Sequence, residues 1–354
     1  MSVKKLTTRQ IYNLVFPLAC YFVFAYPVYR VSNWYGVPIE ISLLESLVLC
    51  ILGLAGMIYS FSGPKIIVRY FIVHWMGISF VFACLALVGE VFTIVFPENK
   101  KLVASTILYF GLGLVVFSIL VSHHLKVKKI QIHSRKLSRP YRLVQISDVH
   151  IGSRQQGFMK RIVNRINGLE PDLVLITGDL IDSSAVNQEA LQSLEELHAK
   201  VFFAIGNHER YADLEKILCI TENLGIKTLR QETASFEELT ISGIDDADIG
   251  EQVEIHLPEL SLKKERFNLL LYHRPVGWEA AIRFGVDLML SGHTHNGQIF
   301  PFNYLVKKQF ARIKGIYQKG HHHLYVSPGT GTWGPLMRLG SMNEITLIEL
   351  VPEA

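Results

Sequence analysis

Residues 143–152 read Leu-Val-Gln-Ile-Ser-Asp-Val-His-Ile-Gly, a short β-branched run that ends in a polar turn. The part from Leu143 to Ser147 has the length and composition of a buried strand. Asp148 and His150 follow this strand directly. In layered α/β proteins, ligands bind beyond the carboxyl ends of the strands. This stretch therefore predicts a sheet domain with a polar site at one edge of the sheet.

The same arrangement recurs along the rest of the chain. Further strand-like runs are DLVLIT, VFFAI, LTISGI, FNLLLY, VDLMLS, LYVS and EITLIEL, and helical periodicity lies between the first of them. Four more polar clusters accompany these runs: Gly178-Asp179, Gly206-Asn207-His208-Glu209, His273 and Gly292-His293-Thr294-His295. Strands that alternate with helices early and crowd together later favour a layered sheet domain with helices outside.

Apart from His208 and Glu209, these clusters offer two carboxylates, one amide and four imidazoles, and no sulfur. Such a set suits Mn, Fe, Zn or Co, and it is large enough for two ions that share one carboxylate. Two metal ions about 3.5 to 4 Å apart favour hydrolysis of a phosphate ester, because they stabilise the attacking and the leaving oxygen together. Each cluster alone is more often ordinary turn chemistry. The occurrence of all five at strand ends, in this order, favours the metal site.

The ordered clusters resemble those of the calcineurin-like metallophosphoesterases over roughly residues 141–350. The resemblance implies an αββα sandwich, in which two sheets are flanked by helices, and a pair of divalent ions for which we expect manganese. By this resemblance one metal is held by Asp148, His150 and His295, the other by Asn207, His273 and His293, and Asp179 bridges them. His208 resembles the family histidine that is not a ligand and that stabilises the phosphoryl oxygens or protonates the leaving group. A hydroxide that bridges the ions is the expected nucleophile.

The stretch Gly178-Asp179-Leu180-Ile181-Asp182-Ser183-Ser184 bears on the substrate. It lacks the arginine that the protein serine/threonine phosphatases of this superfamily carry soon after the bridging aspartate, which disfavours a phosphoprotein. Asp182 has two interpretations: it orients His208, or it is the N-cap of a helix.

The motifs around these residues are similar to those of bacterial membrane-associated phosphodiesterases, which include UDP-2,3-diacylglucosamine pyrophosphatases. The matching motifs are residues 145–152, 292–299 and 327–335. Asn296 stands where that branch usually has glycine. Aromatic and aliphatic residues alternate with Lys307, Lys308 and Arg312 after the last histidine cluster. This segment either dips into the membrane interface and binds an anionic lipid substrate, or forms a partly buried loop with solvated cations.

The first third of the chain has a different composition. The 354 residues are 19% charged with a mean hydropathy of +0.27, but residues 11–122 contain nine charged side chains. Four apolar stretches are each long enough to cross a bilayer: Ile11–Tyr29, Ile41–Phe61, Phe71–Phe96 and Leu102–Val121. We therefore predict a transmembrane helical region at residues 1–122, a basic linker at 123–140 and a metallophosphoesterase domain at 141–354.

The positions of the Lys and Arg residues predict the orientation in the membrane. Twelve lie on one side of the predicted spans and three on the other, which places both termini in the cytoplasm and the chain in the inner or cell membrane. The basic linker is either solvated or lies on anionic headgroups. The net charge of +4 is too small to favour nucleic acid as a partner, and four cysteines do not indicate a disulfide framework.

The sequence thus predicts a membrane-embedded, metal-dependent hydrolase. We expect it to cleave a phosphodiester or pyrophosphate bond in a phosphorylated lipid or a nucleotide-linked lipid, such as UDP-2,3-diacylglucosamine. One alternative is a phosphodiesterase or phosphatase for soluble substrates that the membrane merely localises. The other is a membrane receptor or scaffold without activity.

Overall fold

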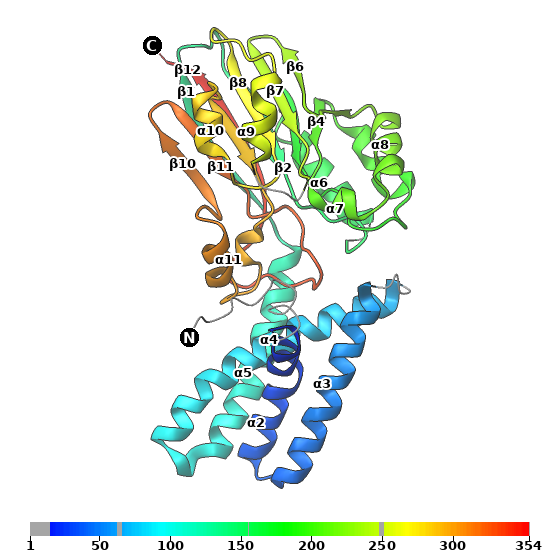
Figure 1. Ribbon diagram of the computed structural model, residues 1–354, viewed down its shortest axis with the longest axis vertical. Coiled ribbons are helices and arrows are strands. Elements are labelled where there is room, and N and C mark those ends of the chain that lie inside the picture. Colours follow the sequence, from blue (N-terminus) through cyan, green and yellow to red (C-terminus); the bar gives the residue numbers. More distant parts are fainter. Residues whose placement is uncertain (1–14, 62–65, 155, 248–250, 354) are drawn as a thin grey trace, which may run out of the picture. The chain divides into compact units, whose positions relative to one another are not determined.

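The computed structural model describes residues 15–61, 66–154, 156–247 and 251–353. The chain forms two compact units, Met1–Leu120 and Val121–Ala354 (Figure 1). The first unit is helical and the second contains all the strands of the described residues.

The first unit consists of long apolar helices. Its elements are η1 (Tyr21–Ala25), α2 (Tyr26–Tyr35), α3 (Ile39–Phe61), α4 (Ile66–Val95), η2 (Pro97–Asn99) and α5 (Lys100–His123), the last turn of which belongs to the second unit. Four helical segments are long and apolar enough to cross a membrane: Val15–Tyr35, Ile39–Tyr59, Val68–Val95 and Pro97–His123. Many of their large apolar side chains are exposed, as expected for helices that face lipid.

These segments correspond to the four predicted spans, with changes at their ends. The first span continues beyond the predicted end at Tyr29 to Tyr35, where Gly36 ends the helix in the left-handed conformation. The predicted start of this span, Ile11, lies outside the described residues. So do four of the cations used for the orientation: Lys4, Lys5, Arg9 and Lys65.

A polar contact joins α2 to α4 within this apolar unit. Arg30 forms an ion pair with Glu90, and the hydroxyl of Tyr26 donates a hydrogen bond of 3.0 Å to the same carboxylate. The Arg30 guanidinium also lies 5.1 Å from the centre of the Trp34 ring. Charged groups among transmembrane helices pair with one another because an isolated charge in that environment is costly.

The second unit contains two six-stranded sheets. Its strands are β1 (Leu125–Ser134), β2 (Tyr141–Ile146), β3 (Leu173–Thr177), β4 (Lys200–Ala204), β5 (Lys227–Thr228), β6 (Glu232–Phe236), β7 (Leu239–Ile244), β8 (Phe267–Tyr272), β9 (Leu288–Ser291), β10 (Gly315–Lys319), β11 (His322–Val326) and β12 (Asn343–Pro352). Its helices are α6 (Gln156–Asn167), η3 (Gln188–Glu196), α7 (Asn207–Tyr211), α8 (Leu214–Asn223), α9 (Gln252–His256), η4 (Leu257–Glu259), α10 (Trp278–Arg283), η5 (His295–Gly297) and α11 (Asn303–Gln309).

The two sheets pack face to face and helices cover their outer faces. The strand orders are β1-β12-β2-β3-β4-β5 and β10-β11-β9-β8-β7-β6. Alternate residues of one strand enter different cores: Leu173 and Leu175 of β3 pack between the sheets, whereas Val174 and Ile176 pack beneath α6, η3 and α8. A third core lies between the second sheet and α9 and α10. The predicted αββα sandwich is therefore confirmed.

The segment predicted as a basic linker is instead a strand. β1 pairs in parallel with β12 over ten residue pairs, from Leu125 to Ser134. Leu125 and Val127 pack against one core and Ile130 and Ile132 against the core between the sheets, while Lys126 and Lys128 point to solvent. Within each pair the spacing of two residues is that of a strand. Because β1 is the edge of its sheet, its exposed lysines also oppose pairing with another chain.

The order of the strands explains how distant clusters meet. β2, β3 and β4 are parallel neighbours in the first sheet, and β8 and β9 are parallel neighbours in the second. Parallel neighbours present their carboxyl ends at the same edge of a sheet. The polar clusters that follow these five strands are thereby brought together at one end of the sandwich.

Candidate metal centre

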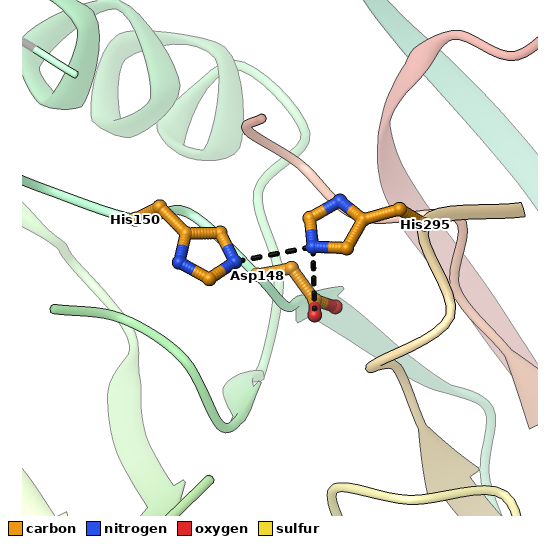
Figure 2. A group of neighbouring side chains, drawn as sticks. All are labelled: Asp148, His150 and His295. Atoms are coloured by element: carbon orange, nitrogen blue, oxygen red, sulfur yellow. Dashed lines mark hydrogen bonds and ion pairs between the residues drawn. The ribbon is translucent and has the colours of Figure 1, made fainter. Parts of the chain in front are cut away.

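The first group of candidate ligands is Asp148, His150 and His295, which come from the ends of β2 and β9 (Figure 2). The two imidazoles face each other with their Nε2 atoms 3.1 Å apart, and His295 Nε2 lies 3.4 Å from Asp148 Oδ1. All three residues are buried. Buried nitrogen and carboxylate lone pairs that converge on one point are the arrangement that a metal ion stabilises.

The second group surrounds Asp179 after β3. Its Oδ2 lies 3.1 Å from His273 Nε2, 3.8 Å from His150 Nε2 and 3.9 Å from His208 Nε2. His293 Nδ1 in turn lies 3.3 Å from His273 Nε2. One carboxylate therefore stands between the His150 side and the His273 side of the site, which is the position that a bridging ligand needs.

Two details test whether these residues fit a metal pair. Asn207 Oδ1 is buried and has no hydrogen-bond partner among the described residues, an expensive state for an amide oxygen unless a ligand satisfies it. His273 Nδ1 lies 2.8 Å from the carbonyl of Thr177. This contact fixes the tautomer with hydrogen on Nδ1 and leaves the Nε2 lone pair for a metal. Both details fit.

The backbone at this edge is strained in a way that a functional site explains. Asp148, His150, Asp179, His293 and His295 all have positive φ, between 48° and 71°. Side chains other than glycine adopt this region at a cost, and such residues cluster at functional sites.

The glycines of the motifs provide space for the candidate ligands. A Cβ at Gly206 would lie 2.2 Å from Asp179 Oδ1, and one at Gly292 would lie 2.3 Å from Asp148 Oδ2. Both distances are far inside a van der Waals contact. The glycines are therefore required because the two carboxylates approach the backbone of the neighbouring loops.

The protonation states without metal follow from burial and from neighbouring charges. Burial lowers the pKa values of His150 and His295 well below the usual range, and burial together with His273 lowers that of His293 to about 3. These imidazoles are neutral, as ligands must be. Burial also lowers the pKa of His273, but the carboxylates of Asp179 and Asp148 outweigh burial and raise it to about 10.

Comparison with known proteins identifies the family. The profile described as calcineurin-like phosphoesterase matches residues 141–297. An uncharacterized metallophosphoesterase of Campylobacter jejuni is 31% identical over 69% of this chain and 70% of its own length. One of Helicobacter pylori is 34% identical over 64% of each chain. The chain belongs to the calcineurin-like metallophosphoesterase family.

A relative that carries a membrane region is also similar. The Danio rerio protein named transmembrane protein with metallophosphoesterase domain is 30% identical over 82% of this chain and 72% of its own length. Together with the four apolar helices, this likeness indicates that the metallophosphoesterase is a membrane protein. It is a hydrolase of phosphate esters with a dinuclear metal centre, for which the two groups around Asp179 are the candidate ligands.

Asp182 of the metallophosphoesterase has a different contact from the two predicted. It accepts hydrogen bonds from the backbone and hydroxyl of Ser153, and its Oδ2 lies 3.8 Å from His150 Nδ1. No helix begins at Asp182 in the described part of the chain. The carboxylate therefore holds the loop after β2 and faces the candidate ligand His150, where it favours a hydrogen on Nδ1. It therefore caps no helix among the described residues, and its orientation of His208 stays a prediction.

Glu209 is a residue of the metal centre that the sequence analysis quoted without giving it a role. It is fully buried, and its carboxylate accepts hydrogen bonds from the backbone amides of Gly206, Asp179 and Ile181. Burial and the nearby Asp179 raise its pKa to about 7. Glu209 ties the loop after β4 to the loop after β3. The sequence signal for this role of Glu209 is its position in the motif Gly206-Asn207-His208-Glu209.

Arg338 is a second residue that the sequence analysis missed. It is fully buried, and burial lowers its pKa to about 9. Its guanidinium donates to the carbonyls of His295, Pro328 and Gly331 and to the side chain of Asn343, and its Nη2 lies 3.4 Å from His295 Nδ1. Arg338 holds two loops around His295. No local spacing marks it, because its partners lie on separate loops.

Aromatic side chains surround the accessible side of the metal centre. The His208 side chain is 16% exposed, more than the side chains of its neighbours His150 and Asp179. The rings of Tyr211 and Trp333 meet the His208 ring edge at 5.5 and 5.9 Å between centroids. Tyr211 is 63% exposed and Trp333 47%. A substrate that reaches His208 therefore passes apolar surface.

We expect metal loading to release about one proton at pH 7.5. In the metal-free protein His273 is protonated, because its pKa of about 10 lies above this pH, and it must lose the proton to become a ligand. Affinity should therefore rise with pH up to that pKa. Calorimetric titration with Mn²⁺ in buffers of different ionisation enthalpy measures the release. The variant His273→Asn should release no such proton, and equal release from both proteins would contradict the assignment.

Proposed function

We propose that this metallophosphoesterase hydrolyses a phosphodiester or pyrophosphate bond of a phosphorylated or nucleotide-linked lipid at the cytoplasmic face of a membrane. The excess of Lys and Arg on one side of the spans supports the cytoplasmic orientation. The observation that carries the proposal is the metal centre itself, where Asp179 stands between two groups of ligands and aromatic rings line the access to His208.

The residues of the chain have separate tasks in this reaction. When bound, the divalent ions supply Lewis-acid chemistry and a nucleophile at neutral pH. Asp179 keeps the two ligand groups together, and the backbone amide of His208 donates to Asp179 Oδ1 at 3.0 Å. His208 Nε2 lies on the accessible side and is placed to give a proton to the leaving oxygen. The rings of Tyr211 and Trp333 both contact the His208 ring.

The composition of the site supports a diester or pyrophosphate rather than a phosphoprotein. Ser183 and Ser184 stand after Asp182, where the related protein phosphatases have an arginine. A phosphomonoester dianion needs such a cation more than a singly charged diester does, because each diester phosphate carries less charge. The exposed rings of Tyr211 and Trp333 suit a substrate with apolar groups next to its phosphate.

The test is a substrate panel with purified full-length protein and Mn²⁺. The panel contains bis(p-nitrophenyl) phosphate, UDP-diacylglucosamine, phospholipids in mixed micelles and cyclic nucleotides, with products identified by mass spectrometry. We expect release of a phosphorylated headgroup or nucleotide from a lipid, with kcat/KM above that for soluble diesters. Higher kcat/KM for a soluble diester or cyclic nucleotide would instead support an enzyme that the membrane only localises.

A further inference from the structure

The last turn of α5 ends among loops of the metal centre. This turn is part of the second unit. The Ser122 carbonyl, one of the terminal carbonyls that no helical amide can reach, accepts hydrogen bonds from Arg154 Nη2 at 2.6 Å and from Asn343 Nδ2. The His123 carbonyl accepts one from Arg161 at 2.6 Å. Residues Ser122 and His123 are thus held by other residues of the second unit.

The residues that hold this turn also border the metal centre. Arg154 lies four residues after His150, on the same loop. Asn343 Oδ1 accepts a hydrogen bond of 2.9 Å from Arg338 Nε, and Arg338 contacts His295. The metal centre therefore lies on the side of the second unit that holds Ser122.

Four large apolar side chains near these loops are exposed, and we call them the apolar surface: Phe300, Tyr304, Leu305 and Trp333. These side chains are 49%, 59%, 55% and 47% exposed, respectively. Phe300 and Tyr304 pack ring against ring with centroids 5.8 Å apart, and Tyr304 and Leu305 belong to α11. α11 lies at the end of the second unit where the chain enters from α5 (Figure 1). Large apolar groups that gather in this way mark a contact site.

Backbone hydrogen bonds connect this apolar surface to the loop that holds the span. The Phe300 amide donates to the Leu339 carbonyl at 2.8 Å, and the Leu339 amide donates to the Gln298 carbonyl at 3.0 Å. The Gln298 side chain accepts from the Trp333 amide at 3.0 Å and donates to its carbonyl at 2.9 Å. Ser122 Oγ donates to the carbonyl of Leu336 in the same loop. Hydrogen bonds thus connect the loops that carry the apolar surface to the loop that contacts Ser122.

We propose that this apolar surface lies in the interface of an anionic bilayer. It thereby places the accessible side of the metal centre, at His208, in the same interface. Trp and Tyr favour the headgroup level, where an apolar ring and a polar tip are both satisfied. Lys307 and Lys308 are exposed on α11 and form no ion pair among the described residues, so both can meet anionic headgroups. Arg312 differs, because it pairs with Glu279 and covers the Trp278 ring.

If the apolar surface lies in the bilayer interface, a lipid substrate can reach the metal centre directly from the membrane. This consequence rests on the proposed function. Trp333 belongs to the apolar surface and also contacts the His208 ring. A lipid in the same leaflet can therefore present its phosphate at His208 while its acyl chains stay in the membrane. A substrate of this kind avoids the large cost of moving its chains into water.

The test measures the depth of single sites in full-length protein in nanodiscs that contain phosphatidylglycerol. A nitroxide is attached through Leu305→Cys or, as a matched control, through Ile255→Cys, with the four native cysteines replaced by alanine. Ile255 on α9 is 52% exposed, close to the value for Leu305. We expect the label at residue 305 to collide with oxygen more than with a water-soluble nickel complex, and the label at residue 255 to show the reverse.

Two outcomes would overturn the proposal. Equal nickel collision at residues 305 and 255 would mean that the apolar surface faces water. Protection of residue 305 from both oxygen and nickel would mean that protein, rather than lipid, covers it. The measurement needs no substrate, so it stands apart from the proposed function: seating without lipid hydrolysis would refute the function and leave this inference intact.

A kinetic arm tests the consequence for substrates. The double variant Tyr304→Ser/Leu305→Ser should lower kcat/KM for a lipid in vesicles by about tenfold, since it removes much of the inserted apolar area. It should leave hydrolysis of bis(p-nitrophenyl) phosphate within about twofold. The control Ile255→Ser should change neither. Equal losses of the double variant on both substrates would contradict the seating of the metal centre on lipid.

Discussion

Replacing Asp179 with alanine is expected to remove both metal ions and to abolish hydrolysis, by at least about 10³-fold. Asp179 Oδ2 lies within 3.9 Å of His273, His150 and His208, so one substitution takes a shared anionic partner from both ligand groups. Metal content by mass spectrometry and turnover of bis(p-nitrophenyl) phosphate measure the two losses.

The variant Asp179→Asn separates charge from shape at this position. It keeps the size of the side chain and one oxygen, and we expect it to retain at most one ion with activity still strongly reduced. Glu215→Ala is a suitable control, because Glu215 is an exposed carboxylate on α8. Two firmly bound ions in Asp179→Ala would show that the carboxylate is not shared.

His208→Ala should keep both ions and lower turnover by about 10² to 10⁴-fold, the usual contribution of a positioned general acid. The His208 side chain is partly exposed. His208 is close enough to His150 and Asp179 to be a ligand, but the groups Asp148–His150–His295 and Asp179–His273–His293 are complete without it. The loss should depend on the leaving group. A p-nitrophenolate leaves without a proton, so its ester should lose less rate than an alkyl phosphodiester.

Two comparisons make the His208 prediction specific. Tyr211→Phe keeps the ring that contacts His208 and should remain within about tenfold of the parent protein. Metal loss in His208→Ala equal to that in Asp179→Ala would refute the separation of their roles. An equal rate loss for both leaving groups would show that His208 stabilises the phosphoryl oxygens and does not protonate the leaving oxygen.

The structure brings the candidate ligands together from clusters that the sequence already showed, because the positions of these clusters are local features. Each of Asp148, Asp179, Asn207 and His293 follows a strand within a few residues, and the carboxyl ends of parallel strands converge wherever such a sheet forms. These strands are also easy to recognise in the sequence. They are buried on both faces and are therefore almost continuously apolar.

The incorrect prediction of a linker has a physical cause. The lysines of residues 126–129 suggested a linker, although Leu125 and Val127, and then Ile130 and Ile132, each carried the two-residue spacing of a strand. The partner strand β12 lies more than 200 residues away in the sequence, so nothing nearby indicated the pairing. The contacts of Asp182 with Ser153 and His150 were not predicted either, because the loop after β2 brings these residues to it.

The sequence by itself determined the two-part organisation, the four apolar helices and the set of residues available for a metal pair. These follow from composition, periodicity and motif order, which are properties of short stretches. Only the tertiary structure decided that Arg338 and Glu209 brace the ligands, that Ser122 is tied to Asn343, and that Trp333 joins the apolar surface to His208. Such contacts join loops that are distant in the sequence or follow the folded path of the backbone. They appear only when packing of the two sheets brings those loops to one edge.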